Sequence, residues 1–118
     1  MKDMGKEAIF SSKVTKWLRE QNIAYEVNTG SIYTTVGRPD LEVYYKGHCI
    51  FLELKTGDYQ PDPLQVEYLN NMRNIGFYAI ILRETIDELK NILYCIDNGI
   101  KYEQEPLPVL DIPDLIFE

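Results

Sequence analysis

The segment from Asp40 to Lys55 consists of two apolar runs on either side of a glycine: Leu41-Glu42-Val43-Tyr44-Tyr45, Gly47, and Cys49-Ile50-Phe51-Leu52-Glu53-Leu54-Lys55. Two such runs around a short Gly-containing break predict a β-hairpin. Because side chains alternate between the faces of a strand, Glu53 and Lys55 point the same way. If the turn has an even number of residues, Asp40 joins them on that face. The intervening residues, Ile50, Leu52 and Leu54, then face a core.

This arrangement would bring the carboxylates of Asp40 and Glu53 within ~5 Å of each other, where they repel. A hard divalent cation removes the repulsion, and Mg²⁺ typically takes one or two carboxylates together with phosphate and water oxygens. A lysine beside the cation, Lys55, can stabilise the charge that builds on a phosphate attacked by water. The alternative is a solvated ladder of surface charges. The apolar neighbours of Glu53 weaken it, since a carboxylate in such a strand needs a partner.

These residues carry a resemblance to a known superfamily. Pro39-Asp40 followed by Glu53-Leu54-Lys55 resembles the PD-(D/E)xK motif of the restriction-endonuclease-like nucleases. The continuation resembles the VRR-NUC branch, whose members occur alone in phages and bacteria; it consists of Lys55-Thr56-Gly57, Pro63-Leu64-Gln65, and Gly76 before an apolar strand. The similarity covers roughly Glu7 to Leu82, and the name-giving Val-Arg-Arg tripeptide does not occur in the chain.

The resemblance implies an Mg²⁺-dependent endonuclease that hydrolyses DNA phosphodiester bonds, with Mn²⁺ as a substitute and branched or junction DNA as the expected substrate. By resemblance, Asp40, Glu53 and the backbone carbonyl of Leu54 would bind the metal. Glu7 would hold metal-bound water, and Lys55 would position the attacking water. The resemblance also implies that a single-domain member pairs into a homodimer.

Two of the site residues have structural explanations of equal weight. Glu7, predicted for the metal site, is also an acid in the first turns of a helix, where the helix dipole favours it. Gln65, predicted as a catalytic-site residue that contacts Lys55 or a phosphate, stands three residues after Asp62. That is the position of a capping-box residue, which bonds the backbone at the start of a helix. The two roles of Gln65 are not exclusive.

Contacts to nucleic acid are predicted for Arg38, in the polar loop before Asp40, and for Lys13 and Lys16, in a basic cluster on the first helix. The formal net charge of −7 opposes tight non-specific binding. Five acidic residues lie in 103–118, which leaves 14 acidic and 12 basic residues before them. The acidic charge and an apolar tail favour the rival hypothesis, a catalytically silent nuclease-like fold that binds nucleic acid or a protein.

Hydrophobic periodicity predicts helix, strand, hairpin, helix, strand and helix in that order. The expected ranges are a helix over 3–21, a strand over 23–28, a polar loop over 29–38, a helix from Asp62-Pro63 to Gly76, a strand over 77–82 buried on both faces, and a helix from the capping box at Thr85 to Gly99. This order predicts an α/β domain with a central mixed sheet flanked by helices, a restriction-endonuclease-like core.

Length and composition predict one nuclease-like domain over 1–102 and an acidic, apolar, Pro-rich tail over 103–118. The tail is expected to pack either on its own domain or on a second subunit. Cys49 and Cys95 are expected to be free, buried thiols in a reducing cytoplasm, and one histidine with two cysteines makes a zinc site unfavourable. His48 is expected to be a solvated turn residue. No apolar run approaches the ~20 residues of a membrane span, and no signal-peptide core is present.

Overall fold

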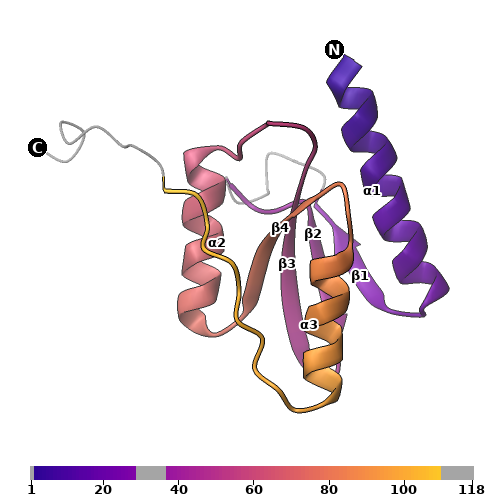
Figure 1. The fold of residues 1–118 in the computed structure, drawn as a ribbon, viewed down its shortest axis with the longest axis vertical. Coiled ribbons are helices and arrows are strands. Elements are labelled where there is room, and N and C mark those ends of the chain that lie inside the picture. Colours follow the sequence, from indigo (N-terminus) through magenta and orange to yellow (C-terminus); the bar gives the residue numbers. More distant parts are fainter. Residues whose placement is uncertain (1, 29–36, 110–118) are drawn as a thin grey trace, which may run out of the picture.

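The computed structural model describes residues 2–28 and 37–109, which form a mixed sheet with helices on both faces (Figure 1). This confirms the predicted α/β class. The elements in chain order are α1 (Lys2–Glu20), β1 (Ala24–Val27), β2 (Leu41–Tyr45), β3 (His48–Lys55), α2 (Pro63–Ile75), β4 (Tyr78–Arg83) and α3 (Asp87–Asp97).

The predicted hairpin is formed by β2 and β3, and it sets the register of the sheet. The strand order is β1-β2-β3-β4, with antiparallel pairs except for the parallel pair β3-β4. Lys46 and Gly47 make the turn with φ angles of 47° and 85°. Two residues with positive φ match the right-handed twist of a hairpin, and this two-residue turn pairs Leu41 with Leu52. The even turn assumed from the sequence is therefore confirmed.

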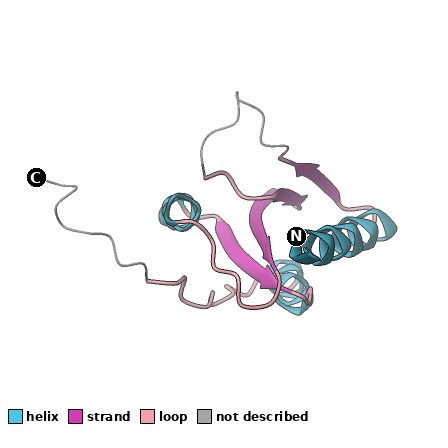
Figure 2. Ribbon diagram, turned by 90° about the horizontal axis from the view of Figure 1, so that it is seen from above, coloured by secondary structure: helices cyan, strands magenta, loops and turns pink. Residues whose placement is uncertain are grey.

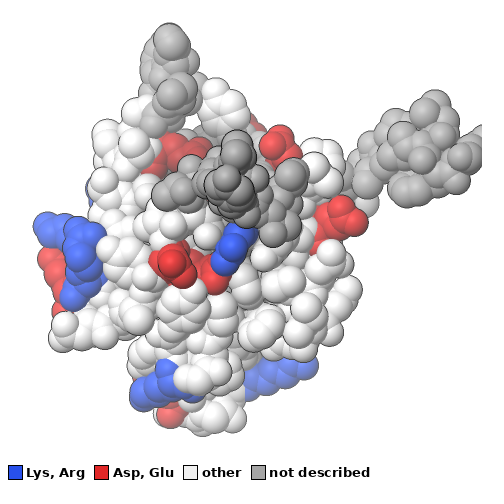
Figure 3. All heavy atoms as spheres, turned by 180° about the vertical axis from the view of Figure 1, so that it is seen from behind, with Lys and Arg blue, Asp and Glu red and all other residues white. Residues whose placement is uncertain are grey.

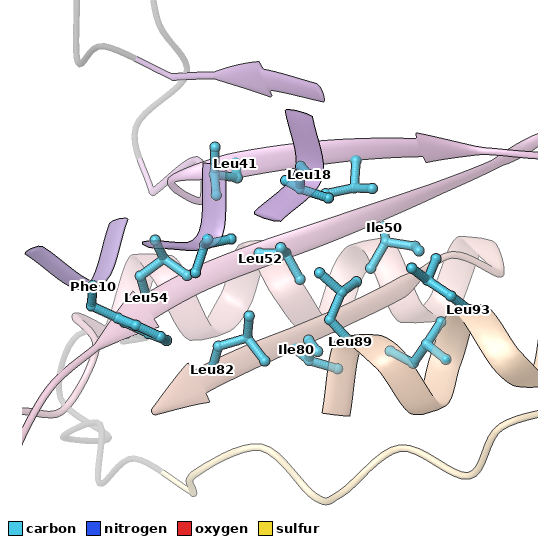
Figure 4. Close-up of a cluster of buried hydrophobic side chains, with 13 residues drawn as sticks. Phe10, Leu18, Leu41, Ile50, Leu52, Leu54, Ile80, Leu82, Leu89 and Leu93 are labelled. Atoms are coloured by element: carbon cyan, nitrogen blue, oxygen red, sulfur yellow. The ribbon is translucent and has the colours of Figure 1, made fainter. Parts of the chain in front are cut away.

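The helices cover the two faces of the sheet unequally, as the view from above shows (Figure 2). Helices α1 and α3 pack on one face with the main apolar cluster, whose side chains are drawn in Figure 4. Helix α2 packs on the other face around Phe51, Leu69 and Ala79. Along α1, Val14 and Leu18 enter the core, as the periodicity predicts. The periodicity left either Ile9 or Phe10 for the buried stripe; Phe10 is buried and Ile9 is 59% exposed.

Strand β4 differs from the prediction of a strand buried on both faces, because it lies at an edge of the sheet and its Ile81 is only half-buried. The chain after α3 covers this edge instead. The backbone N–H of Ala79 donates to the Gln104 side chain at 2.8 Å, and Leu107 packs on the Phe51 cluster. Up to Leu107 the tail thus packs on its own domain, whereas Val109 is exposed. Residues 110–118, part of the predicted interface, lie outside the described residues.

Several smaller predictions need correction. Helix α3 begins at Asp87, and its N-cap is Ile86 rather than the predicted Thr85. Thr85 Oγ1 accepts from the backbone N–H of Asp87, two residues on, at 3.2 Å. Cys49 and Cys95 are free, as predicted, but half-buried rather than buried.

His48 is exposed, as predicted, but it is the first residue of β3 rather than a turn residue. The centroid of its ring lies 6.2 Å from the centroid of the Tyr78 ring. Most of the predicted polar loop, 29–36, lies outside the described residues.

None of the helices that the structure describes is both long enough and apolar enough to cross a membrane.

Candidate active site

The structure brings Asp40, Glu53 and Lys55 together on the α2 face of the sheet. Asp40 directly precedes β2, and the pairing of Leu41 with Leu52 places it opposite Glu53. The Oδ2 atom of Asp40 accepts a hydrogen bond from the Leu54 backbone N–H at 2.8 Å. Lys55 follows two residues after Glu53 on the same strand, so its side chain shares that face. The three residues that the sequence places on one face are therefore neighbours.

Glu53 is the most unusual group of the site, because its side chain is a carboxylate with only 1% of the residue exposed. Its Oε2 atom lies 3.4 Å from Lys55 Nζ. Its Oε1 atom is buried and has no hydrogen-bond partner among the described residues. Burial, followed by the charge of Asp40, raises the pKa of Glu53 to about 7, and Lys55 opposes this shift. The strand therefore holds a carboxylate whose charged form is poorly compensated by the protein.

The charged form of Asp40 is also incompletely compensated by the protein. Its pKa is raised because burial disfavours the carboxylate, although the Leu54 N–H and the charge of Lys55 lower it. Two facing carboxylates, one with an oxygen that no donor in the described part of the chain reaches, form a set that fits a hard cation with oxygen ligands such as Mg²⁺. Asp40, Glu53 and the adjacent Leu54 carbonyl are the groups that would hold it. This fit comes from the donor set and the orphaned oxygen, independently of any resemblance.

Glu7 lies on α1 and is half-buried. Its charge adds a minor contribution to the raised pKa of Glu53, which places the two carboxylates within electrostatic range. Among the described side chains, no three carboxylate, imidazole or thiol groups are close enough to share one metal ion. Glu7 is thus near the pair without joining it in one cluster, and its role in holding water stays a prediction.

The chain leading into Asp40 is held from two directions. The Asn28 backbone N–H donates to the Asp40 carbonyl at 2.9 Å, and Asn28 Nδ2 donates to the Pro39 carbonyl at 2.5 Å. Gly37 has φ of 84°, and a Cβ there would lie 2.5 Å from the Leu64 carbonyl oxygen, so only glycine fits. The role of Asn28 in holding this segment was not predicted from the sequence. The one indication was that a polar residue ends the predicted strand.

Arg38, predicted to contact nucleic acid, is engaged within the protein. Its Nε donates to Glu42 Oε2 at 2.8 Å, and Tyr44 Oη donates to Glu42 Oε1 at 2.9 Å. Glu42 is 6% exposed, so this pair neutralises a second buried acid on the same face as Asp40. No role was predicted for Glu42 from the sequence, although its even position in β2 puts it on the same face as Asp40. An ion pair inside the protein is the structural role of Arg38.

Gln65 has the capping role that the sequence left open. Its Oε1 atom accepts from the Asp62 backbone N–H at 2.8 Å, at the start of α2. A further contact to Lys55 or to a phosphate stays a prediction.

We expect Gln65→Ala to lower the free energy of unfolding by about 1 kcal/mol, because the Asp62 N–H loses its acceptor. Thermal melting compared with Gln21→Ala, a change at an exposed glutamine after α1, would measure the effect. Equal melting temperatures for the two variants would contradict the capping role. A loss of specific activity beyond the loss of folded protein would add the site role.

The loop after Lys55 is tied to the end of β4, a connection that the sequence did not suggest. The Gly57 backbone N–H donates to Glu84 Oε2 at 2.7 Å. Arg83 Nη1 donates to the Tyr59 carbonyl at 2.7 Å. Because β3 and β4 are parallel, both loops leave the sheet at the same end, beside the N-terminal half of α1 (Figure 1).

The predicted nucleic-acid contacts Lys13 and Lys16 are exposed on α1, and Lys16 Nζ lies 3.9 Å from Glu20. In the view from behind, basic side chains form small groups interspersed with acidic ones (Figure 3). The lysine and arginine side chains visible on this face thus form no continuous basic band. This pattern agrees with weak rather than tight non-specific binding of a polyanion.

Comparisons with known protein families and with curated proteins found no match for this chain. The functional proposal therefore depends on the site geometry together with the motif.

Proposed function

We propose that the protein is a metal-dependent deoxyribonuclease of the PD-(D/E)xK type, similar to the VRR-NUC branch, that hydrolyses DNA phosphodiester bonds. The observation that carries the proposal is the buried Glu53 carboxylate, with an unpartnered Oε1 atom, opposite Asp40 and beside Lys55. A purely structural pair of facing acids would be destabilising without compensation. The presence of Glu53 on a central strand, opposite Asp40, favours a bound cation as part of the working protein.

Each residue has a defined task in this proposal. Asp40 and Glu53 provide the oxygen ligands, and the Leu54 N–H holds Asp40 in place through its Oδ2 atom. A divalent cation bound there would activate a water molecule and polarise the phosphate. Lys55, whose side chain is only 15% exposed, orients the attacking water and stabilises negative charge on the phosphate oxygens. No described side chain is assigned as a dedicated general base.

The assay that tests the proposal is DNA cleavage with Mg²⁺ or Mn²⁺, and with a chelator as control. The substrates would be duplex, single-stranded, flap and four-way junction DNA, because the resemblance implies a preference for branched substrates. We expect cleavage only with the metal, and an increase in melting temperature of the DNA-free protein when Mg²⁺ is added. Binding without cleavage of any substrate would contradict the proposal and favour a silent binding module. Homodimer formation stays a separate prediction, tested by sedimentation.

A further inference from the structure

A cleft of about 230 Å³ lies between α1 and the end of the sheet at which β3 and β4 end. The residues that line it come from helix α1 and from the loops that follow β3 and β4. Its lining residues are Lys6, Ile9, Phe10, Lys13, Thr56 and Glu84. Thr56 directly follows Lys55 in the chain, so the cleft begins where the active-site strand ends. A shallower depression lined by Ile9, Lys13 and Lys16 continues from it along α1.

The charges in the cleft are only partly compensated. Lys6 and Lys13 are exposed, and neither forms an ion pair with a side chain that the structure describes. They lie seven residues apart, so they share one side of the helix with Ile9 between them. Two lysines around an exposed apolar side chain offer cations for phosphate groups and an apolar surface for a sugar.

Glu84, a carboxylate in the lining of the cleft, shows that a backbone donor in the neighbouring loop binds an acidic group. Its carboxylate receives the Gly57 backbone N–H at 2.7 Å, in a loop where Gly57 and Glu84 have φ angles of 59° and 63°. A left-handed conformation is uncommon for a residue with a side chain, and it brings this carboxylate to the cleft. A backbone N–H that binds a carboxylate is equally a donor for a phosphate oxygen.

We propose that this cleft binds a phosphate group of the DNA strand adjacent to the one that is cleaved, through Lys6, Lys13 and the loop at Gly57. Glu84 occupies the position in the free protein and opposes binding by its charge. This inference rests on the proposed function for the identity of the strand. It adds to that function a site for a substrate phosphate, and it makes the Glu84 carboxylate a competitor of that phosphate within the protein. Local binding through two lysines would let a chain with net charge −7 hold DNA.

The proposal predicts opposite effects for changes of opposite charge in one cleft. We expect the double variant Lys6→Gln/Lys13→Gln to weaken DNA binding about tenfold at low salt, and Glu84→Gln to strengthen it about threefold. The slope of log Kd against log salt concentration should fall by about 2 in the double variant, because two lysine contacts to the phosphate are lost. Glu84→Gln keeps an oxygen for the Gly57 N–H, so the loop remains tied.

The experiment measures fluorescence anisotropy of a labelled DNA oligonucleotide with full-length protein in a chelator, so that cleavage does not interfere. Lys101→Gln, at an exposed lysine beyond α3 and outside the cleft, is the matched control and should bind like the wild type. Competition with inorganic phosphate distinguishes a strand from a free ion. If the cleft binds a phosphate group of a DNA strand, inorganic phosphate should displace the DNA only at concentrations far above that of the DNA.

Four results would overturn the subsite: no binding by the wild type, a Lys6/Lys13 variant that binds like Lys101→Gln, weaker binding by Glu84→Gln, or displacement by phosphate at concentrations similar to that of DNA. Circular dichroism of each variant ensures that a loss of binding reflects the cleft rather than unfolding. The proposed function fails separately. Binding that depends on Lys6 and Lys13, without cleavage in Mg²⁺, would support the subsite and contradict the nuclease.

Discussion

Asp40→Asn, Glu53→Gln and Lys55→Met should each lower the rate of DNA cleavage by about 10²- to 10⁴-fold, while the protein remains folded. The two carboxylate changes remove metal ligands, and the lysine change removes the cation that stabilises charge on the phosphate; losses of about 10²–10⁴ are typical for such groups. Asn at position 40 retains an oxygen for the Leu54 N–H, which holds the residue in place. The fold is therefore expected to survive the changes that stop the chemistry.

Steady-state cleavage in Mg²⁺, with circular dichroism on the same samples, would measure this result. Glu67→Gln is a matched control, since it neutralises an exposed carboxylate on α2 that is not among the predicted site residues. Its activity should equal that of the wild type. Cleavage at the wild-type rate by either carboxylate variant would show that the metal site is wrongly assigned, even if the protein proves to be a nuclease.

The second large effect concerns the stability of the metal-free protein and its dependence on pH. Burial and the charge of Asp40 raise the pKa of Glu53 from 4.5 to about 7. In the unfolded chain this carboxyl ionises near its ordinary value. Between about pH 4.5 and 7 the folded protein therefore binds more protons at Glu53 than the unfolded chain does. Stability from this group is greatest below that range, falls as pH rises through it, and is constant above it.

Glu53→Gln removes the ionising group and should make the metal-free protein more stable above pH 7 by roughly 3 kcal/mol, with little difference below pH 4.5. Urea unfolding in a chelator across this range would measure the difference. Addition of Mg²⁺ should stabilise the wild type and leave Glu53→Gln nearly unchanged, because the bound cation offsets the same charge. Parallel stability curves for the two proteins from pH 4.5 to 7 would exclude a raised pKa at Glu53.

The sequence alone determined the hairpin and the residues that share its polar face. This was possible because strand side chains alternate with a period of two and a two-residue turn leaves a single register. Once Leu41 is opposite Leu52, Asp40 is opposite Glu53 without further information. The core face followed from the same alternation, and the α/β class followed from the order of periodic segments. These are local properties, which short stretches of sequence specify.

Only the tertiary structure decided what surrounds that face, because the decisive contacts join residues far apart in the chain. Asn28 holds the carbonyl of Asp40, and Glu84 receives the N–H of Gly57 across 27 positions. Arg38 and Glu42 are only four residues apart in the sequence. Even so, the sequence does not distinguish between a substrate contact and an internal ion pair for an arginine that precedes an active site. The depth at which Glu53 is buried, and hence its pKa, depends on packing by several elements at once. Alternation orients a side chain, but burial and pairing depend on what the rest of the chain places beside it.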